Sequence, residues 1–207
     1  ITILRDYAKR ETTKREHTAL IRQYYGYRDF SEQPWSFRLS RLLYARAWVS
    51  NERPSLMFDF ATSWLTQHKI ILPGETTLSR LISEIRERSS KRLWRRLSAL
   101  PTSEQKLKLE ALLHVPEGNR ISLFDYYRKG PVTISAPAFN EAMKRYIELR
   151  EFGLSKLNFS HIPPVRLKNL ASHAGVISMK KIARMQDDRR IAMLVAFVKS
   201  FEIFSLD

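Results

Sequence analysis

Glycine is scarce in this chain, and its positions limit the folds that the chain can adopt. The 207 residues include six glycines, about 3% against roughly 7% in average proteins, so few positions suit the positive φ angles of β-rich turns. These are Gly26, Gly74, Gly118, Gly130, Gly153 and Gly175. Each lies between segments whose apolar residues recur at helical spacing, and prolines mark the same joints. The sequence therefore predicts an all-α, multi-helical fold with helix-turn-helix-like subdomains packed in series.

The glycines and prolines also set the expected helix boundaries. We expect helices at residues 6–25, 34–50, 54–69, 76–100, 102–113, 135–152, 164–174, 178–185 and 188–204, with one or two further turns at 122–129. Thr76 or Thr77 is expected to cap the fourth helix by accepting a backbone N–H bond. Thr102 and Gln105 form a T-x-x-Q capping box for the fifth.

The same joints divide the chain into four expected parts. Residues 1–28 form a helix that continues from an upstream part, since the chain starts with Ile1 and not with Met. Residues 29–115 form a helical subdomain, 116–134 a linker or loop, and 135–207 a second helical subdomain. We expect the chain to be cut from a longer protein.

Positive charge is the strongest feature of the composition. The chain has 36 Lys and Arg residues against 21 Asp and Glu, a net charge of +15 and a pI near 10.3, which favours a polyanionic partner. The longest apolar run, Ile191 to Val198, is far shorter than the roughly 20 residues that span a bilayer, so no membrane partner is expected. The absence of Cys excludes a disulfide framework and a Cys-based zinc site, and fits a cytoplasmic, bacterial protein.

Residue patterns for catalysis are missing. The five histidines are scattered, and no phosphate-binding loop, dinucleotide-binding or hydrolase-elbow motif occurs. The adjacent acids Asp187 and Asp188 point about 100° apart on a helix, which is poor geometry for one metal ion and better suited to favouring a helix start. We therefore expect no catalytic residue, no metal site and no cofactor in this chain.

The segment 54–100 is a candidate helix-turn-helix. Its last helix carries seven Lys and Arg residues between positions 76 and 100 against Glu84 and Glu87. In a helix-turn-helix, the start of this helix would present Thr76, Thr77, Ser79 and Arg80 to base edges, and Arg88, Lys91 and Arg95 would bind phosphates. The alternative is a solvated helix face, with i, i+4 ion pairs of Glu84 with Arg88 and Glu87 with Lys91.

The segment 164–187 is a second candidate. Small Ala171 would let two helices approach, Gly175 would permit a left-handed turn, and Ser178 would cap the next helix. The cations that would face nucleic acid are Lys180, Lys181 and Arg184. Two acids oppose seven cations here, namely Arg166, Lys168, Lys180, Lys181, Arg184, Arg189 and Arg190. A plain α-hairpin is the alternative.

Aromatic residues cluster at the junction of the first two expected helices. They are Tyr24, Tyr25, Tyr27, Phe30, Trp35 and Phe37. Such residues can stack on unpaired bases, which would favour a single-strand or RNA-binding protein. We expect them instead to be core residues that seal this junction.

Several strings resemble one protein family over essentially the whole chain and in the same order. They are YYGYRDF, RLLYARAWVSNERP, SWLTQHKIILPGETTLSRLISEIRE, KGPVTISAPAFNEAM, VRLKNLASHAGVISMKKIARM and RIAMLVAFV. They are similar to the N-terminal region of the Tn-three family of replicative transposases. The resemblance implies recognition of terminal inverted repeats on double-stranded DNA, with a homodimer in the full-length protein. It also implies that the acidic triad and its divalent metal lie in a catalytic domain downstream of this region.

Two functions remain open at this point. The first is a non-catalytic region that binds double-stranded DNA with sequence specificity. The second is a dimerisation or architectural scaffold that makes only non-specific DNA contacts. For the scaffold, apolar residues of the last helix would be covered by a missing domain or a second protomer; these are Phe197, Phe201, Ile203 and Phe204. An independent nuclease is disfavoured, because no cluster of acids is present.

Overall fold

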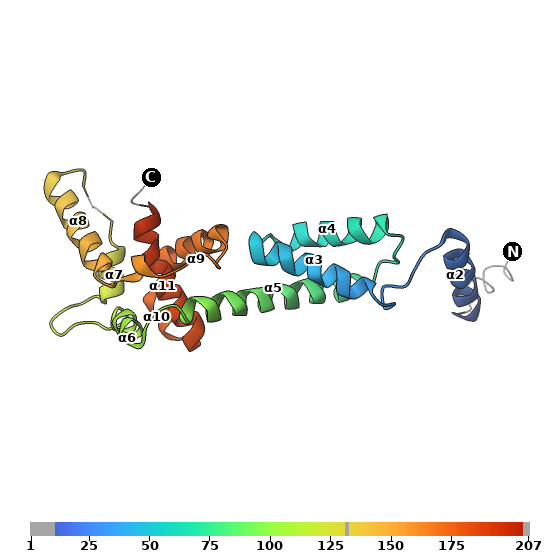
Figure 1. The fold of residues 1–207 in the computed structure, drawn as a ribbon, viewed down its shortest axis with the longest axis horizontal. Coiled ribbons are helices and arrows are strands. Elements are labelled where there is room, and N and C mark those ends of the chain that lie inside the picture. Colours follow the sequence, from blue (N-terminus) through green and yellow to red (C-terminus); the bar gives the residue numbers. More distant parts are fainter. Residues whose placement is uncertain (1–10, 131–132, 205–207) are drawn as a thin grey trace. The chain divides into compact units, whose positions relative to one another are not determined.

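The computed structural model describes residues 11–130 and 133–204, and within these ranges the chain is helical and has no strand (Figure 1). The helices are α2 (Glu11–Tyr25), α3 (Trp35–Val49), α4 (Pro54–Gln67), α5 (Glu75–Ser98), α6 (Ser103–Ala111), α7 (Leu123–Arg128), α8 (Ala136–Arg150), η1 (Leu154–Lys156), α9 (Pro164–Val176), α10 (Met179–Ala183) and α11 (Asp187–Phe204). The predicted all-α class is confirmed. Positions 6–10 of the first expected helix lie outside the described residues.

Most helix ends follow from local sequence signals. Pro54 occupies the first position of α4, where its missing N–H costs nothing. The capping box of α6 is present: Gln105 N donates to Thr102 Oγ1 at 3.2 Å, and Thr102 N donates to Gln105 Oε1 at 2.9 Å. The predicted capping of α5 by Thr76 or Thr77 is wrong, because α5 begins at Glu75 and both threonines lie inside its first turn.

Glycine conformations agree with the predicted joints except at one site. Gly26 follows α2 with a φ of 69°, and Gly153 follows α8 with a φ of 70°, a left-handed geometry that favours glycine. The predicted left-handed turn at Gly175 is wrong, because Gly175 lies within α9 and the chain leaves this helix only at Ile177.

The chain is divided into two compact units. Unit 1 comprises residues 1–47 and 52–86, and unit 2 comprises residues 48–51 and 87–207. The division therefore falls within α5, whereas the sequence pattern places a linker at 116–134, a segment that belongs to unit 2.

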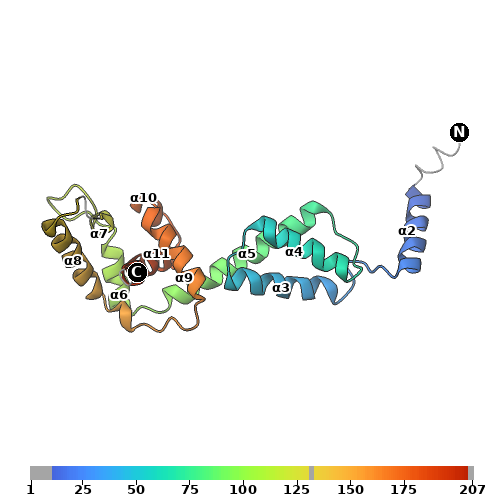
Figure 2. The same cartoon turned by 90° about the horizontal axis from the view of Figure 1, so that it is seen from above.

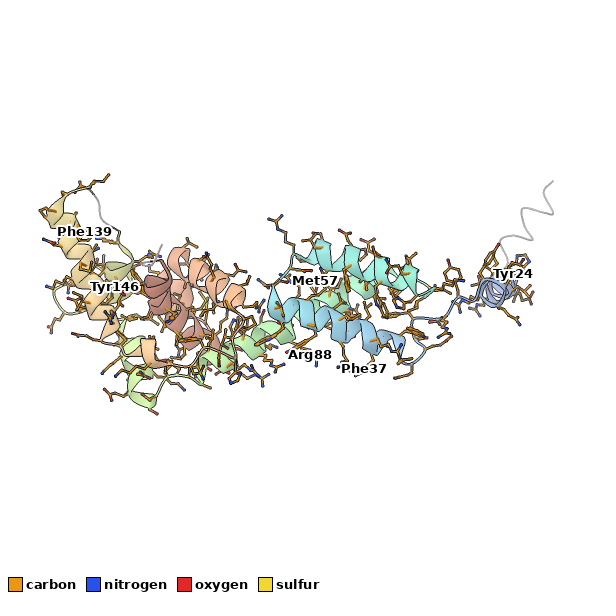
Figure 3. All side chains as sticks on the ribbon, turned by 45° about the horizontal axis from the view of Figure 1, so that its top comes forward. Tyr24, Phe37, Met57, Arg88, Phe139 and Tyr146 are labelled. Atoms are coloured by element: carbon orange, nitrogen blue, oxygen red, sulfur yellow. The ribbon has the colours of Figure 1, made fainter. Side chains whose placement is uncertain are left out.

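The core of unit 1 is built from α3, α4 and the N-terminal half of α5, which lie side by side (Figure 2). Its buried residues recur at three- and four-residue spacing on each helix: Leu39, Leu43 and Ala47 of α3, Met57, Ala61 and Leu65 of α4, and Leu78, Ile82 and Ile85 of α5. Figure 3 labels Met57 among these helices. Each helix thus buries one stripe and leaves its other face to solvent, as the apolar periodicity predicts.

The core of unit 2 surrounds α11. All eight residues from Ile191 to Val198 are at most 5% exposed, because α9, α6, α8, α10 and η1 pack against this helix. The prediction that Phe197 awaits a missing partner is wrong: it is 1% exposed, with its ring centroid 4.2 Å from that of Phe124. Phe201 is half-buried against the same core, and the side chains of Ile203 and Phe204 lie outside the described residues. None of the helices described is both long and apolar enough for a membrane span.

Candidate nucleic-acid interface

The predicted DNA-contacting residues at the start of α5 all lie on the exposed side of unit 1. Thr76, Thr77, Ser79 and Arg80 are exposed, while Leu78 on the same turns is buried. Arg80 has no carboxylate partner among the described residues. The first two turns of α5 therefore present hydroxyls and one unpaired guanidinium to solvent.

A hollow of about 340 Å³ opens beside Ser79, between α4 and α5. Asp59 and Glu75 line it together with hydroxyl-bearing side chains, and Phe58 and Ile82 provide its apolar surface. Carboxylates repel phosphates but accept hydrogen bonds from the amino groups of bases. The start of α5 is thus chemically different from its arginine-rich continuation, a distinction that the cation count alone does not show.

The connection between α4 and α5 differs from the predicted turn. It runs from 68 to 74, longer than the roughly three to four residues of a helix-turn-helix. Within it, Ile70 pairs with Arg28 in an isolated parallel bridge: Arg28 N donates to Lys69 O and Ile71 N donates to Arg28 O, both at 2.9 Å. The connection is therefore fixed by the chain before α3.

In unit 2, the second half of α5 presents the other predicted phosphate contacts. Arg88, Lys91 and Arg95 are exposed, and Figure 3 labels Arg88. Lys91 forms the predicted ion pair with Glu87 at 2.7 Å. The other predicted pair, Glu84 with Arg88, is not formed among the described residues. Arg88 and Arg95 therefore carry charge that no acid of the described chain neutralises.

Two further arginines of α5 contact Trp48. The Cζ atoms of Arg92 and Arg96 lie 4.9 and 5.3 Å from the centroid of the Trp48 ring, and Arg96 Nη1 donates to His161 O at 3.0 Å. These contacts hold both guanidiniums against unit 2. No local spacing in the sequence links Trp48 to α5, so this role of Arg92 and Arg96 could not be predicted.

The second predicted site has a shorter turn than expected. α9 ends at Val176 and α10 starts at Met179, so only Ile177 and Ser178 connect them. Arg128 of α7 fixes this turn, since its Nη1 donates to Ile177 O at 2.7 Å and its Nη2 pairs with Asp125 at 2.7 Å. Ala171 is 1% exposed, as expected for a close helix approach. Ser178 makes no side-chain cap bond, so its predicted capping role is wrong.

The second site presents only part of the charge counted from the sequence. Ser178, Lys180, Lys181 and Arg184 are exposed, as is Lys168. The remaining three cations have partners within unit 2. Arg166 is 4% exposed and lies 3.4 Å from Ser90 Oγ; Arg189 lies over Trp94; Arg190 pairs with Glu110 and Asp187, each at 2.8 Å. The excess of charge at this site is therefore smaller than composition predicts.

The aromatic cluster divides into two groups. Phe30 and Trp35 pack against the unit 1 core, as expected. The prediction that Tyr24, Tyr25, Tyr27 and Phe37 also belong to the core is wrong, because they are between 42% and 83% exposed. Figure 3 labels Tyr24 on α2 and Phe37 on α3.

Comparisons with known proteins give one consistent group of relatives. A family model described as a domain of unknown function (DUF4158) matches residues 1–85. The chain is 60% identical over 205 residues, or 99% of its length, to the transposase for transposon gamma-delta of Escherichia coli (strain K12). It is 28% identical over 197 residues, 93% of its length, to the transposase for transposon Tn501 of Pseudomonas aeruginosa. It is also 28% identical over 211 residues, 95% of its length, to the transposase for transposon Tn1546 of Enterococcus faecium. These matches cover 20%, 19% and 21% of the relatives, so the chain spans about a fifth of their length.

Proposed function

The chain belongs to the Tn-three family of transposases, and on this premise we propose that it binds double-stranded DNA at the terminal inverted repeats of its transposon during transposition. The observation that carries the proposal is the set of exposed cations without an acidic partner among the described residues. They are Arg80, Arg88, Arg95, Lys180, Lys181 and Arg184. Such cations bind DNA phosphates and release counterions, whereas paired or buried ones contribute little.

Within this proposal, the two ends of α5 have different roles. Thr76, Thr77, Ser79 and Arg80 read base edges, because they combine hydroxyl and guanidinium donors on an exposed helix start. Arg88 and Arg95 contact phosphates, as do Lys180, Lys181 and Arg184 of the second site, with Ser178 beside them, and Lys91 contributes less because Glu87 pairs with it. The region is non-catalytic and works in the bacterial cytoplasm. Strand cleavage and its divalent metal belong to another part of the transposase.

A salt series with two duplexes tests the proposal. The chain is titrated onto a duplex carrying the transposon end and onto a scrambled duplex of the same composition, with binding followed by fluorescence anisotropy. We expect tighter binding to the transposon end and a steep fall in affinity with salt on both duplexes. Equal affinity for the two duplexes would contradict end recognition. Footprinting on the transposon end then locates the bases that are contacted.

One observation favours the second candidate, a dimerisation scaffold. Phe139, Met143 and Ile147 follow one another at four-residue spacing on α8 and are 62%, 42% and 53% exposed (Figure 3, which labels Phe139). The opposite side of α8 buries Arg145 and Leu149 within unit 2. An exposed apolar stripe of this kind is typical of an interaction site. Sedimentation without DNA separates the candidates, because a scaffold should self-associate and lose that property in Met143→Lys.

A further inference from the structure

We propose that unit 1 carries an additional phosphate-binding site on the outer side of α3, formed by Arg28, Arg38 and Arg41 around two aromatic rings. The ligand is the phosphodiester backbone of duplex DNA. This inference rests on the proposed function, because it adds a contact surface for the same DNA. None of these three arginines belongs to the two segments that the sequence pattern singles out.

Aromatic rings orient the three guanidiniums. The Cζ atoms of Arg28 and Arg38 lie 5.1 and 5.3 Å from the centroid of the same ring, that of Trp35. The Cζ atom of Arg41 lies 5.8 Å from the centroid of Phe37. A guanidinium held over a ring keeps the N–H groups at its edge available, and these bind phosphate oxygens in pairs.

The fold of unit 1 holds the ring of Trp35 and the backbone of Arg28 in place. Trp35 is half-buried against the core, with its centroid 6.3 Å from that of Trp64. The backbone of Arg28 is held on both sides by the bridge to Ile70, through two hydrogen bonds of 2.9 Å. Because the ring and one of its arginines are anchored before DNA binds, little conformational entropy is lost when a phosphate arrives.

Charge at the site is not neutralised within the described chain. Helix α3 contains no acidic residue, and Arg28, Arg38 and Arg41 are exposed, with no carboxylate partner among the residues described. The remaining arginine of α3 behaves differently: Arg46 pairs with Glu52 at 2.8 Å. The guanidiniums of Arg28 and Arg38 share one indole ring, so their like charges repel each other, and a bound anion relieves that repulsion.

Acids near the site are already engaged. Asp29 pairs with Arg22 at 3.2 Å and accepts hydrogen bonds from the backbone N and the hydroxyl of Ser31. Glu32 accepts from the backbone N of Asp29 at 3.2 Å. No carboxylate of the described residues is therefore paired with Arg28, Arg38 or Arg41, and a polyanion such as DNA matches these three charges.

The test compares double variants of the full chain on the transposon-end and scrambled duplexes. In R28Q/R38Q we expect the slope of log affinity against log salt to become shallower by about 1 to 2, and affinity to fall on the order of tenfold on both duplexes. R28K/R38K keeps the charges and should keep most of the slope. The matched control is R120Q/K156Q, which removes two exposed cations from unit 2. Circular dichroism melting checks that each variant is folded.

The outcomes separate this inference from the proposed function. A shallower salt slope in R28Q/R38Q supports the site even when the chain shows no preference for the transposon end. That missing preference would contradict only end recognition. A slope and affinity equal to those of R120Q/K156Q overturn the site, while a retained end preference leaves the proposed function intact. A chain that binds neither duplex overturns both.

Discussion

Ser98 Oγ donates a hydrogen bond of 2.7 Å to the carboxylate of Asp188, which ties the last turn of α5 to the first turn of α11 within unit 2. Ser98 is 6% exposed, so its hydroxyl depends on this bond and on a weaker one of 3.2 Å to Arg95 O. Asp188 also carries negative charge at a helix start, where it is favourable. The residue expected only to begin α11 therefore also joins two helices.

The first prediction concerns this bond. Ser98→Ala and Asp188→Ala should each lower the free energy of unfolding by about 1 to 2 kcal/mol, because each removes a hydrogen bond that involves a charged group. The double variant should cost less than the two single variants together, since both remove the same bond. Urea unfolding followed by far-UV circular dichroism measures all three. Strictly additive costs would show that the bond contributes nothing to stability.

The second prediction separates base reading from phosphate binding on α5. Arg80→Ala should cost about 1 to 3 kcal/mol on the transposon end and reduce the preference for it. Arg95→Ala should weaken binding equally on both duplexes and reduce the salt slope by about 1. The two variants remove the same charge from one helix, so each serves as the control for the other. Identical behaviour of the two would contradict a base-reading role for Arg80.

The third prediction contrasts two cations of the second site. Hydrogen bonding to Glu110 raises the pKa of Arg190, and the pair is partly shielded from water. Arg190→Ala should therefore lower the free energy of unfolding by about 1 to 3 kcal/mol. Lys181→Ala, at an exposed position, should change stability little and weaken DNA binding. Urea unfolding measures the stability of both variants, and anisotropy on the same samples measures their affinity for DNA. A binding defect without a stability loss in Arg190→Ala would contradict the structural role of Arg190.

The fourth prediction concerns alkaline pH. Burial, with further contributions from Glu148, raises the pKa of Tyr127 to about 12. The phenol of an unfolded chain titrates near 10. The folded state holds this proton more tightly, so its contribution to stability is complete below about pH 10 and is lost as the pH rises toward 12. Tyr127→Phe should reduce the loss of stability across this pH range in melting experiments. An unchanged pH profile would contradict a contribution of the Tyr127 proton to stability.

Much of the fold could be predicted because its signals are local. Glycine and proline positions predict the ends of α2, α4 and α8, and Thr102 with Gln105 predicts the start of α6. The division within α5 could not be predicted in this way. A continuous apolar stripe runs from Leu78 to Leu97, and only tertiary packing assigns its two halves to different cores.

The candidate site was less predictable than the fold. Exposure of Arg80, Arg88 and Arg95 follows from helical periodicity, since they lie away from the apolar stripe. The burial of Arg166 does not follow from helical periodicity. Ser90, which helps to hold this arginine, is 76 residues away in the sequence. The arginines around Trp35 are close to it in the sequence, but only the fold shows that their guanidiniums lie over its ring.

The burial of Ile191 to Val198 on all sides has a consequence for the order in which the protein matures. The core residues of unit 1 that the structure describes lie between Leu39 and Ile85, so a ribosome has delivered them well before it reaches α11. The core of unit 2 lacks its central helix until the last residues of this chain have emerged. We expect unit 1 to fold during synthesis while unit 2 waits with apolar surface exposed, which makes unit 2 the part that chaperones bind and proteases cut first.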